Sequence, residues 1–142
     1  MVPRRVVMYH VDAARLADIA ERYGLDMVVI FGSQVSGHVR AGADIDVAVR
    51  MQRRSWGDWE RELELVGELT KAITGDGDLD VVFLNGASPL LLFEVASGGV
   101  VLYQGQPTTF AQFQSYAARR YDDSRKFFEL QRTYLEEKYA SG

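Results

Sequence analysis

Residues 32–46 read GSQVSGHVRAGADID, a Gly-Ser pair followed after ten further residues by two aspartates. A Gly-Ser turn that enters a helix offers backbone N–H groups and a hydroxyl to a phosphate. Asp44 and Asp46 are separated by one apolar residue, so on a strand both carboxylates project from the same face. Two carboxylates opposite a phosphate-binding turn suit a magnesium-nucleotide site, because Mg²⁺ prefers oxygen ligands. The stretch therefore predicts Gly32 and Ser33 as nucleotide-binding residues and both acids as metal ligands.

The flanking segments predict two strands joined through this stretch. Residues 26–31 are almost continuously apolar, which is typical of a strand covered on both faces, and they end at the Gly-Ser pair. Residues 33–39 are expected to form a short helix or helical turn. Residues 44–49 are expected to form the second strand, with Ile45, Val47 and Val49 on the face opposite the two acids. We therefore expect one face of this strand to be core and the other to be the site.

A third acid lies farther along the chain. Asp80 occupies a predicted strand over residues 79–84, where a neighbour in the sheet could bring it to the first two acids. Asp76 and Asp78 compete for this role, but they lie in a glycine-flanked turn, where aspartate is favoured for local hydrogen bonding. We therefore expect Asp80 to be the third metal ligand.

The rest of the pattern predicts a single α/β unit. Helices are expected over residues 12–24, 55–75 and 90–96, with a short strand over 100–103. The second helix is expected to begin with a capping box at Ser55, and its predicted apolar stripe contains Trp59, Leu63, Val66, Leu69 and Ile73. Residues 108–139 contain no glycine or proline and predict one or two C-terminal helices. We expect one domain over 1–142, with its core over 12–104.

Composition narrows the class of protein. With 142 residues, 47% hydrophobic and 25% charged, the chain fits one soluble globular domain with no membrane segment. A net charge of -4 argues against a broad nucleic-acid surface. The chain has no cysteine and only two histidines, which excludes thiolate sites and disfavours zinc. Because the start of the chain does not resemble a secretory signal, we expect a cytoplasmic protein.

Two segments carry a resemblance to a known family. Residues 30–33 (IFGS) and 44–49 (DIDVAV) resemble the signature of the nucleotidyltransferases of the DNA polymerase β superfamily. Residues 79–85 (LDVVFLN) and the segment 88–103 resemble the minimal nucleotidyltransferases in particular, and the likeness covers about residues 25–105. The resemblance implies an α/β fold in which helices flank a small mixed sheet and a helical tail follows.

The resemblance also implies an activity and the residues that perform it. ATP would be the substrate, with Gly32 and Ser33 holding its triphosphate and Asp44, Asp46 and Asp80 binding two Mg²⁺ ions. AMP would pass to an acceptor hydroxyl and pyrophosphate would leave. Asp80 would lie nearest the acceptor, where it or solvent could take the proton.

Because a family this small lacks a second domain to hold a bulky acceptor, we expect the acceptor to be bound partly by another protein or to be a protein itself. Proteins that this chain resembles commonly act as antitoxins of HEPN-type ribonuclease toxins and silence them by transferring AMP to a tyrosine, a pairing similar to type VII toxin-antitoxin systems. The aromatic C-terminal helices would suit docking on such a helical partner, and packing on the chain's own sheet is an equal alternative. A homo-oligomer is also compatible with the sequence.

Two other functions stay open. One is an adenylyltransferase for a small hydroxylated molecule such as an aminoglycoside, which would require an acidic acceptor pocket. The other is a binding module that neutralises a partner by contact alone. Gln34 and Ala43 keep this module open, because related proteins often carry a basic residue and a serine at these positions.

Overall fold

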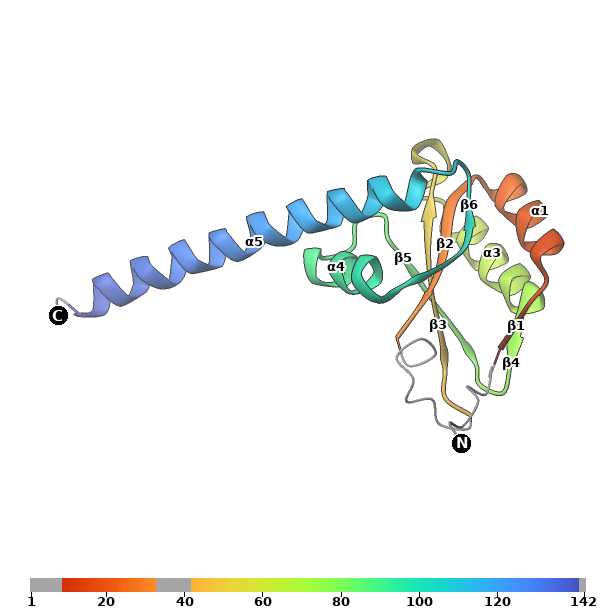
Figure 1. The fold of residues 1–142 in the computed structure, drawn as a ribbon, viewed down its shortest axis with the longest axis horizontal. Helices are drawn as coiled ribbons and strands as arrows, with labels where there is room; N and C mark the ends of the chain where they lie inside the picture. Colours follow the sequence, from red (N-terminus) through yellow and green to blue (C-terminus); the bar gives the residue numbers. More distant parts are fainter. Residues whose placement is uncertain (1–8, 33–41, 141–142) are drawn as a thin grey trace, which may run out of the picture.

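The computed structural model describes residues 9–32 and 42–140, and Figure 1 shows how its elements are arranged. The strands are β1 (Tyr9–Val11), β2 (Leu25–Phe31), β3 (Ile45–Met51), β4 (Ile73–Gly75), β5 (Leu79–Phe83) and β6 (Val100–Gln104). The helices are α1 (Ala13–Tyr23), α3 (Trp59–Ala72), α4 (Pro89–Gly98) and α5 (Thr109–Ala140), with a 3-10 turn at Arg53–Ser55. The predicted α/β fold with a helical tail is confirmed, and the helix expected over 33–39 lies outside the described residues.

The main sheet has four strands in the order β5-β3-β2-β6. β3 pairs parallel with β5 and antiparallel with β2, and β6 pairs antiparallel with β2, so the sheet is mixed as expected. β1 and β4 form a separate antiparallel pair that no sequence pattern predicted. This topology brings the beginnings of β3 and β5 and the end of β2 to the same end of the sheet.

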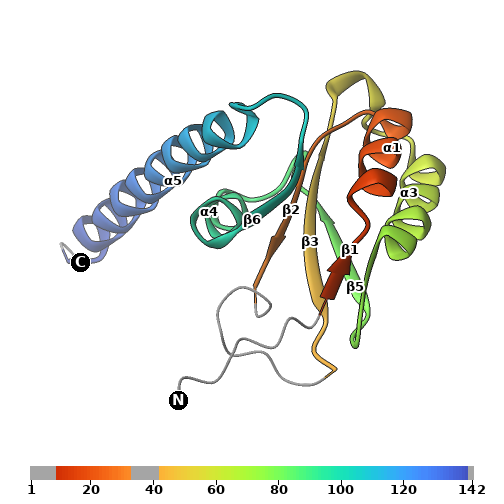
Figure 2. The ribbon, with the colours of Figure 1, turned by 45° about the vertical axis from the view of Figure 1, so that its right-hand side comes forward.

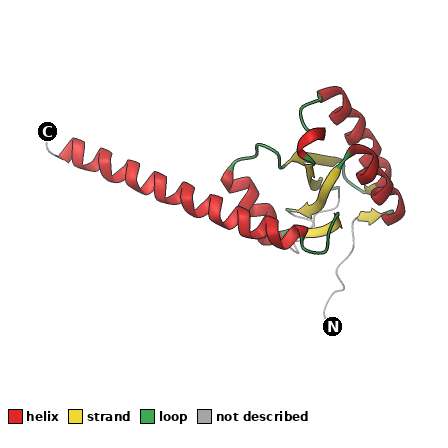
Figure 3. Cartoon of the chain, turned by 90° about the horizontal axis from the view of Figure 1, so that it is seen from above, coloured by secondary structure: helices red, strands yellow, loops and turns green. Residues whose placement is uncertain are grey.

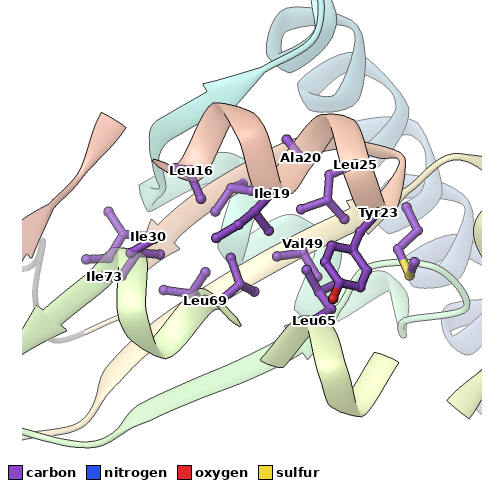
Figure 4. Close-up of a cluster of buried hydrophobic side chains, with 14 of the residues drawn as sticks. Leu16, Ile19, Ala20, Tyr23, Leu25, Ile30, Val49, Leu65, Leu69 and Ile73 are labelled. Carbon is purple, nitrogen blue, oxygen red and sulfur yellow. The ribbon is translucent and has the colours of Figure 1, made fainter. Parts of the chain in front are cut away.

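Helices lie on both faces of the main sheet, as Figure 2 shows. α1 and α3 cover one face, where Ile45, Val47 and Val49 are buried as predicted; Figure 4 shows part of this cluster. On the other face, Ala48 is buried in a second cluster with side chains from α4 and α5, among them Phe113. The expectation that this second face would serve only as the site is therefore wrong. Along this second face of β3, the side chain of Asp46 is only partly buried and that of Ala48, two residues later, is fully buried in the core.

Side-chain caps fix where the helices begin. Asp12 and Ser88 each accept a hydrogen bond from the backbone N–H three residues later, at 3.1 and 3.2 Å, and so begin α1 and α4. Asp58 does the same for α3, at 3.2 Å. The capping box expected at Ser55 is wrong, because Arg53–Ser55 form a 3-10 turn before the helix.

The buried stripe of α3 also differs from the predicted one. Leu65, Leu69 and Ala72 are buried, whereas Trp59 and Leu63 are 66% and 62% exposed. Apolar residues three and four apart fit more than one face of a helix. Packing against α1 selects the face that is buried, and this tertiary contact is not visible in the periodicity.

α5 is one helix of 32 residues, which resolves the expectation of one or two. Its first half packs on the domain, with Phe113 and Ala117 buried and Tyr121 stacked on Phe93 at 4.2 Å between ring centroids. Its second half projects away from the body of the molecule (Figures 1 and 3). Within residues 9–32 and 42–140, no helix has the length and apolar character needed to span a membrane.

Candidate functional site

Two of the predicted metal ligands are direct neighbours in the sheet. Asp46 is the second residue of β3, and its register partner on the parallel strand β5 is Asp80. On the other side of β3, the partner of Asp46 is Phe31, the last residue of β2. Side chains at paired positions lie on the same face of a sheet. The topology thus brings together two carboxylates from residues that are far apart in the sequence.

Gly32 completes this end of the sheet and lies against Asp46. Its φ of 74° is a left-handed conformation that other residues rarely adopt. A Cβ atom at this position would lie 2.5 Å from Oδ2 of Asp46, closer than Cβ atoms approach other heavy atoms in proteins. The backbone conformation therefore favours glycine, and a side chain at this position would displace the Asp46 carboxylate. The backbone that should bind phosphate thus adjoins the carboxylate that should bind metal.

Asp44 lies next to these residues but not on the strand. The prediction that the strand begins at Asp44 is wrong, since β3 begins at Ile45. The Ile45 N–H donates to the carbonyl of Asp78 at 2.8 Å, so the chain is hydrogen-bonded to the turn before β5 at this point. The residue that follows Asp44 is therefore joined both to β3 and to the turn before β5.

The charges of the three acids act on one another. Partial burial of the Asp46 carboxyl raises its pKa above the usual value, and the negative charges of Asp80 and Asp44 raise it further. Asp44 and Asp80 are exposed. A divalent cation among these carboxylates would offset their repulsion, and their oxygens are of the type that Mg²⁺ prefers.

The carboxylates of Asp44, Asp46 and Asp80 are ligands of the type that a magnesium ion takes, but their side chains are not yet arranged around a common point. Among the described residues, no group of three or more acidic, histidine or cysteine side chains is already arranged to hold a metal ion. The fit rests on the register pairing of Asp46 with Asp80 and on the mutual influence of the three charges. Metal binding by these residues stays a prediction.

Ser33 and Gln34 lie outside the described residues, so the predicted role of Ser33 stays a prediction. Of the competing acids, Asp78 accepts the Ile45 N–H through its backbone carbonyl, a bond that does not involve its carboxylate.

Gly77 lies against the backbone beside Asp44, and none of the motifs described above contains it. The available signal was its place in a Gly-Asp-Gly-Asp turn that directly precedes the strand of Asp80.

Comparisons with known proteins agree with this geometry. The family described as Polymerase beta, Nucleotidyltransferase matches residues 14–108. The protein adenylyltransferase MntA of Aphanizomenon flos-aquae (strain 2012/KM1/D3) is 31% identical over 96 residues, covering 63% of this chain. The match spans 64% of that protein's own length.

Three solved structures with a similar fold are described as toxin-antitoxin structures. A chain of a mutant toxin-antitoxin MntA-HpeT complex matches with a TM-score of 0.63 and 20% identity, covering 91% of this chain and 98% of that one. A toxin-antitoxin structure with AMP-PNP matches with a TM-score of 0.56 and 21% identity, with the same coverage. A complex of a tri-AMPylated Shewanella oneidensis HEPN toxin with MNT antitoxin matches at 0.51 and 20%, covering 90% of this chain and 95% of that one.

At this level of identity the solved structures establish only the fold, whereas the match to the family model establishes the family to which the chain belongs. The family match covers the strand that leads to Gly32, both strands that carry the paired acids, and the helices α3 and α4 with nearly all of α1. This chain therefore belongs to the polymerase beta nucleotidyltransferase family.

Proposed function

We propose that the chain is a cytoplasmic, Mg²⁺-dependent nucleotidyltransferase that transfers AMP from ATP to a tyrosine of a HEPN-type toxin and thereby acts as its antitoxin. The observation that carries this proposal is the pairing of Asp46 with Asp80 beside Gly32. The MntA relative is named a protein adenylyltransferase, and the similar complexes contain HEPN toxins or an ATP analogue. These names support the proposed substrate and partner.

The residues of this chain would divide the work as follows. Gly32 and Ser33 would bind the triphosphate through backbone N–H groups and a hydroxyl. Asp44, Asp46 and Asp80 would hold Mg²⁺, which when bound supplies charge neutralisation for the phosphates and a lower pKa for the acceptor hydroxyl. The acceptor oxygen would form a bond to the α-phosphorus, while the bond between the α-phosphorus and the oxygen that bridges to the β-phosphate breaks. Pyrophosphate leaves with that oxygen. Asp80 or solvent would take the acceptor proton.

The projecting half of α5 is the surface that we assign to the toxin. Large apolar side chains on it are exposed, namely Phe127, Phe128, Leu130, Tyr134 and Leu135. A groove of about 510 Å³ begins where this half leaves the domain, lined by Leu90 of α4 and Tyr121 and Phe128 of α5 among others. An apolar helix face of this kind suits docking on another helical protein.

Labelled ATP tests the activity directly. The chain is incubated with α-labelled ATP, Mg²⁺ and the protein encoded next to it, and we expect label on a tyrosine of that partner. Asp46→Asn and Asp80→Asn should each abolish transfer with the fold intact. Asp76→Asn is the matched control, because it removes an exposed acid from the turn before β5 and should leave transfer unchanged.

The other outcomes separate the alternatives. Label on an added aminoglycoside would favour the small-molecule enzyme. No label, combined with full neutralisation of the partner, would favour the contact-only module. Loss of transfer in Asp76→Asn but not in Asp80→Asn would show that the third acid has been assigned to the wrong residue.

Docking on α5 is tested separately from catalysis. A Phe127→Ser, Tyr134→Ser double variant should lose co-elution with the partner in size-exclusion chromatography. It should keep the wild-type rise in melting temperature with Mg²⁺ and ATP, since ligands that bind only the native state stabilise it. Unchanged co-elution would move the toxin interface away from this helix.

A further inference from the structure

A glycine in the turn before β5 touches the backbone on which Asp44 is carried. A Cβ atom on Gly77 would lie 1.9 Å from the carbonyl oxygen of Ala43, 2.6 Å from its carbonyl carbon and 3.1 Å from the nitrogen of Asp44. These are main-chain atoms, so no side chain rotation can relieve the overlap. Any residue other than glycine at position 77 would have to push the two backbone segments apart.

The requirement at Gly77 is for space and not for an unusual conformation. The glycines with positive φ among the described residues are Gly24, Gly32, Gly42, Gly57 and Gly86, and Gly77 is not one of them. A left-handed backbone is therefore not the reason for a glycine at position 77. The close approach to Ala43 and Asp44 is what a side chain here would disturb.

The same contact connects the segments that carry the three acids. The turn leads directly into β5 and Asp80, and beside the contact the Ile45 N–H donates to the carbonyl of Asp78 at 2.8 Å. Asp44 is therefore carried on a backbone that is held from one side by the turn. A displacement of this backbone would move Asp44 relative to Asp46 and Asp80, which the strand pairing keeps in place.

We propose that Gly77 is a positioning residue: the missing side chain lets the turn close on the Ala43–Asp44 backbone and sets the spacing of Asp44 from the paired acids. This role rests on the proposed function, since the spacing matters for metal and nucleotide. An alanine would have to open the contact by roughly 1 Å before it became sterically acceptable. A misplacement of that size in a catalytic site can cost about 100-fold in rate.

The test compares Gly77→Ala with Gly105→Ala. Gly105 also lies outside helices and strands, lacks a positive φ, and has room for a Cβ atom, whose nearest neighbour would be 3.6 Å away. For Gly77→Ala we expect a roughly 100-fold lower rate of AMP transfer, a higher Mg²⁺ concentration for half-maximal rate, and loss of the Mg²⁺-induced rise in melting temperature. Its Ile45 amide should exchange hydrogen faster. Gly105→Ala should stay within about twofold of wild type in rate and keep the melting response.

A double-mutant cycle with Asp44→Asn shows whether Gly77 acts through Asp44. If it does, Gly77→Ala should reduce the Mg²⁺ response and the rate no further in the Asp44→Asn background. A further loss there, wild-type behaviour of Gly77→Ala, or failure of Gly77→Ala to fold without metal would each overturn the positioning role. A wild-type protein with neither a Mg²⁺ response nor AMP transfer would instead refute the proposed function, and the positioning role with it.

Discussion

The contact between Gly32 and Asp46 gives the sharpest prediction, because the chain contains a matched control for it. Gly32 and Gly86 both have a φ of 74°, but a Cβ atom on Gly86 would have no neighbour within 4 Å. A left-handed conformation costs a residue other than glycine about 1–2 kcal/mol. Gly32→Ala and Gly86→Ala should therefore lose similar stability, equivalent to roughly 3–8 °C in melting temperature.

The two variants should differ in activity. In Gly32→Ala the new Cβ atom would start 2.5 Å from Oδ2 of Asp46, so the carboxylate has to move by roughly 0.5 Å or more. Because this oxygen is at the end of a side chain, the move costs little stability but takes the carboxylate away from its place beside Asp80. We expect a rate of AMP transfer about tenfold lower than in Gly86→Ala.

Both rates are measured with labelled ATP at saturating Mg²⁺, at a temperature where circular dichroism shows both variants folded. Thermal melts without metal supply the stability comparison. Equal rates in the two variants would show that the position of the Asp46 carboxylate does not matter for transfer. A much larger stability loss in Gly32→Ala would show that the carboxylate cannot move as we expect.

Further predictions concern the charge of Asp46, the buried ring of Phe113 and the hydrogen bonds of Asn85. The pKa of the Asp46 carboxyl is raised, so the folded state binds this proton more tightly than the unfolded state does. The proton therefore stabilises the fold below the usual pKa of aspartate, and this stabilisation is lost as the pH rises through the raised pKa. Asp46→Asn should remove this loss in metal-free urea melts at a series of pH values. Phe113→Ala should lower the free energy of unfolding by about 3–5 kcal/mol, because the ring is buried, whereas exposed Phe127→Ala should change it by less than about 0.5 kcal/mol, both by urea denaturation. Asn85→Ala should cost about 1–3 kcal/mol in the same assay, because the amide exchanges two hydrogen bonds of 2.9 Å with the backbone of Met51.

The segment from β2 to β3 could be predicted from the sequence because its signals are local. The apolar run that ends at Gly32 and the alternation around Asp46 depend only on neighbouring residues, and the structure confirms both strands. The choice of Asp80 depended on a sheet neighbour, and the parallel pairing of β3 with β5 confirms that it lies beside Asp46. Its function as a metal ligand stays a prediction.

Features that depend on tertiary contacts could not be predicted. The strands β1 and β4 have three residues each, too few for a periodic pattern, and their pairing joins distant segments. The aromatic residues of α5 occur around the helix, so periodicity does not show that Phe113 faces the second core. The hydrogen bond between Ile45, next to Asp44, and the carbonyl of Asp78 joins segments that are distant in the sequence, so no local pattern shows it.

The projecting half of α5 has a consequence for how the molecule unfolds. Because this half lacks the packing that anchors the first half at Phe113, its backbone hydrogen bonds can open without the domain unfolding. Amide exchange along α5 should therefore become faster from the domain toward Ala140, while amides of β2 and β3 exchange only through global unfolding. A docked partner would slow amide exchange along the whole of α5, so that the projecting half would open only when the rest of the domain unfolds.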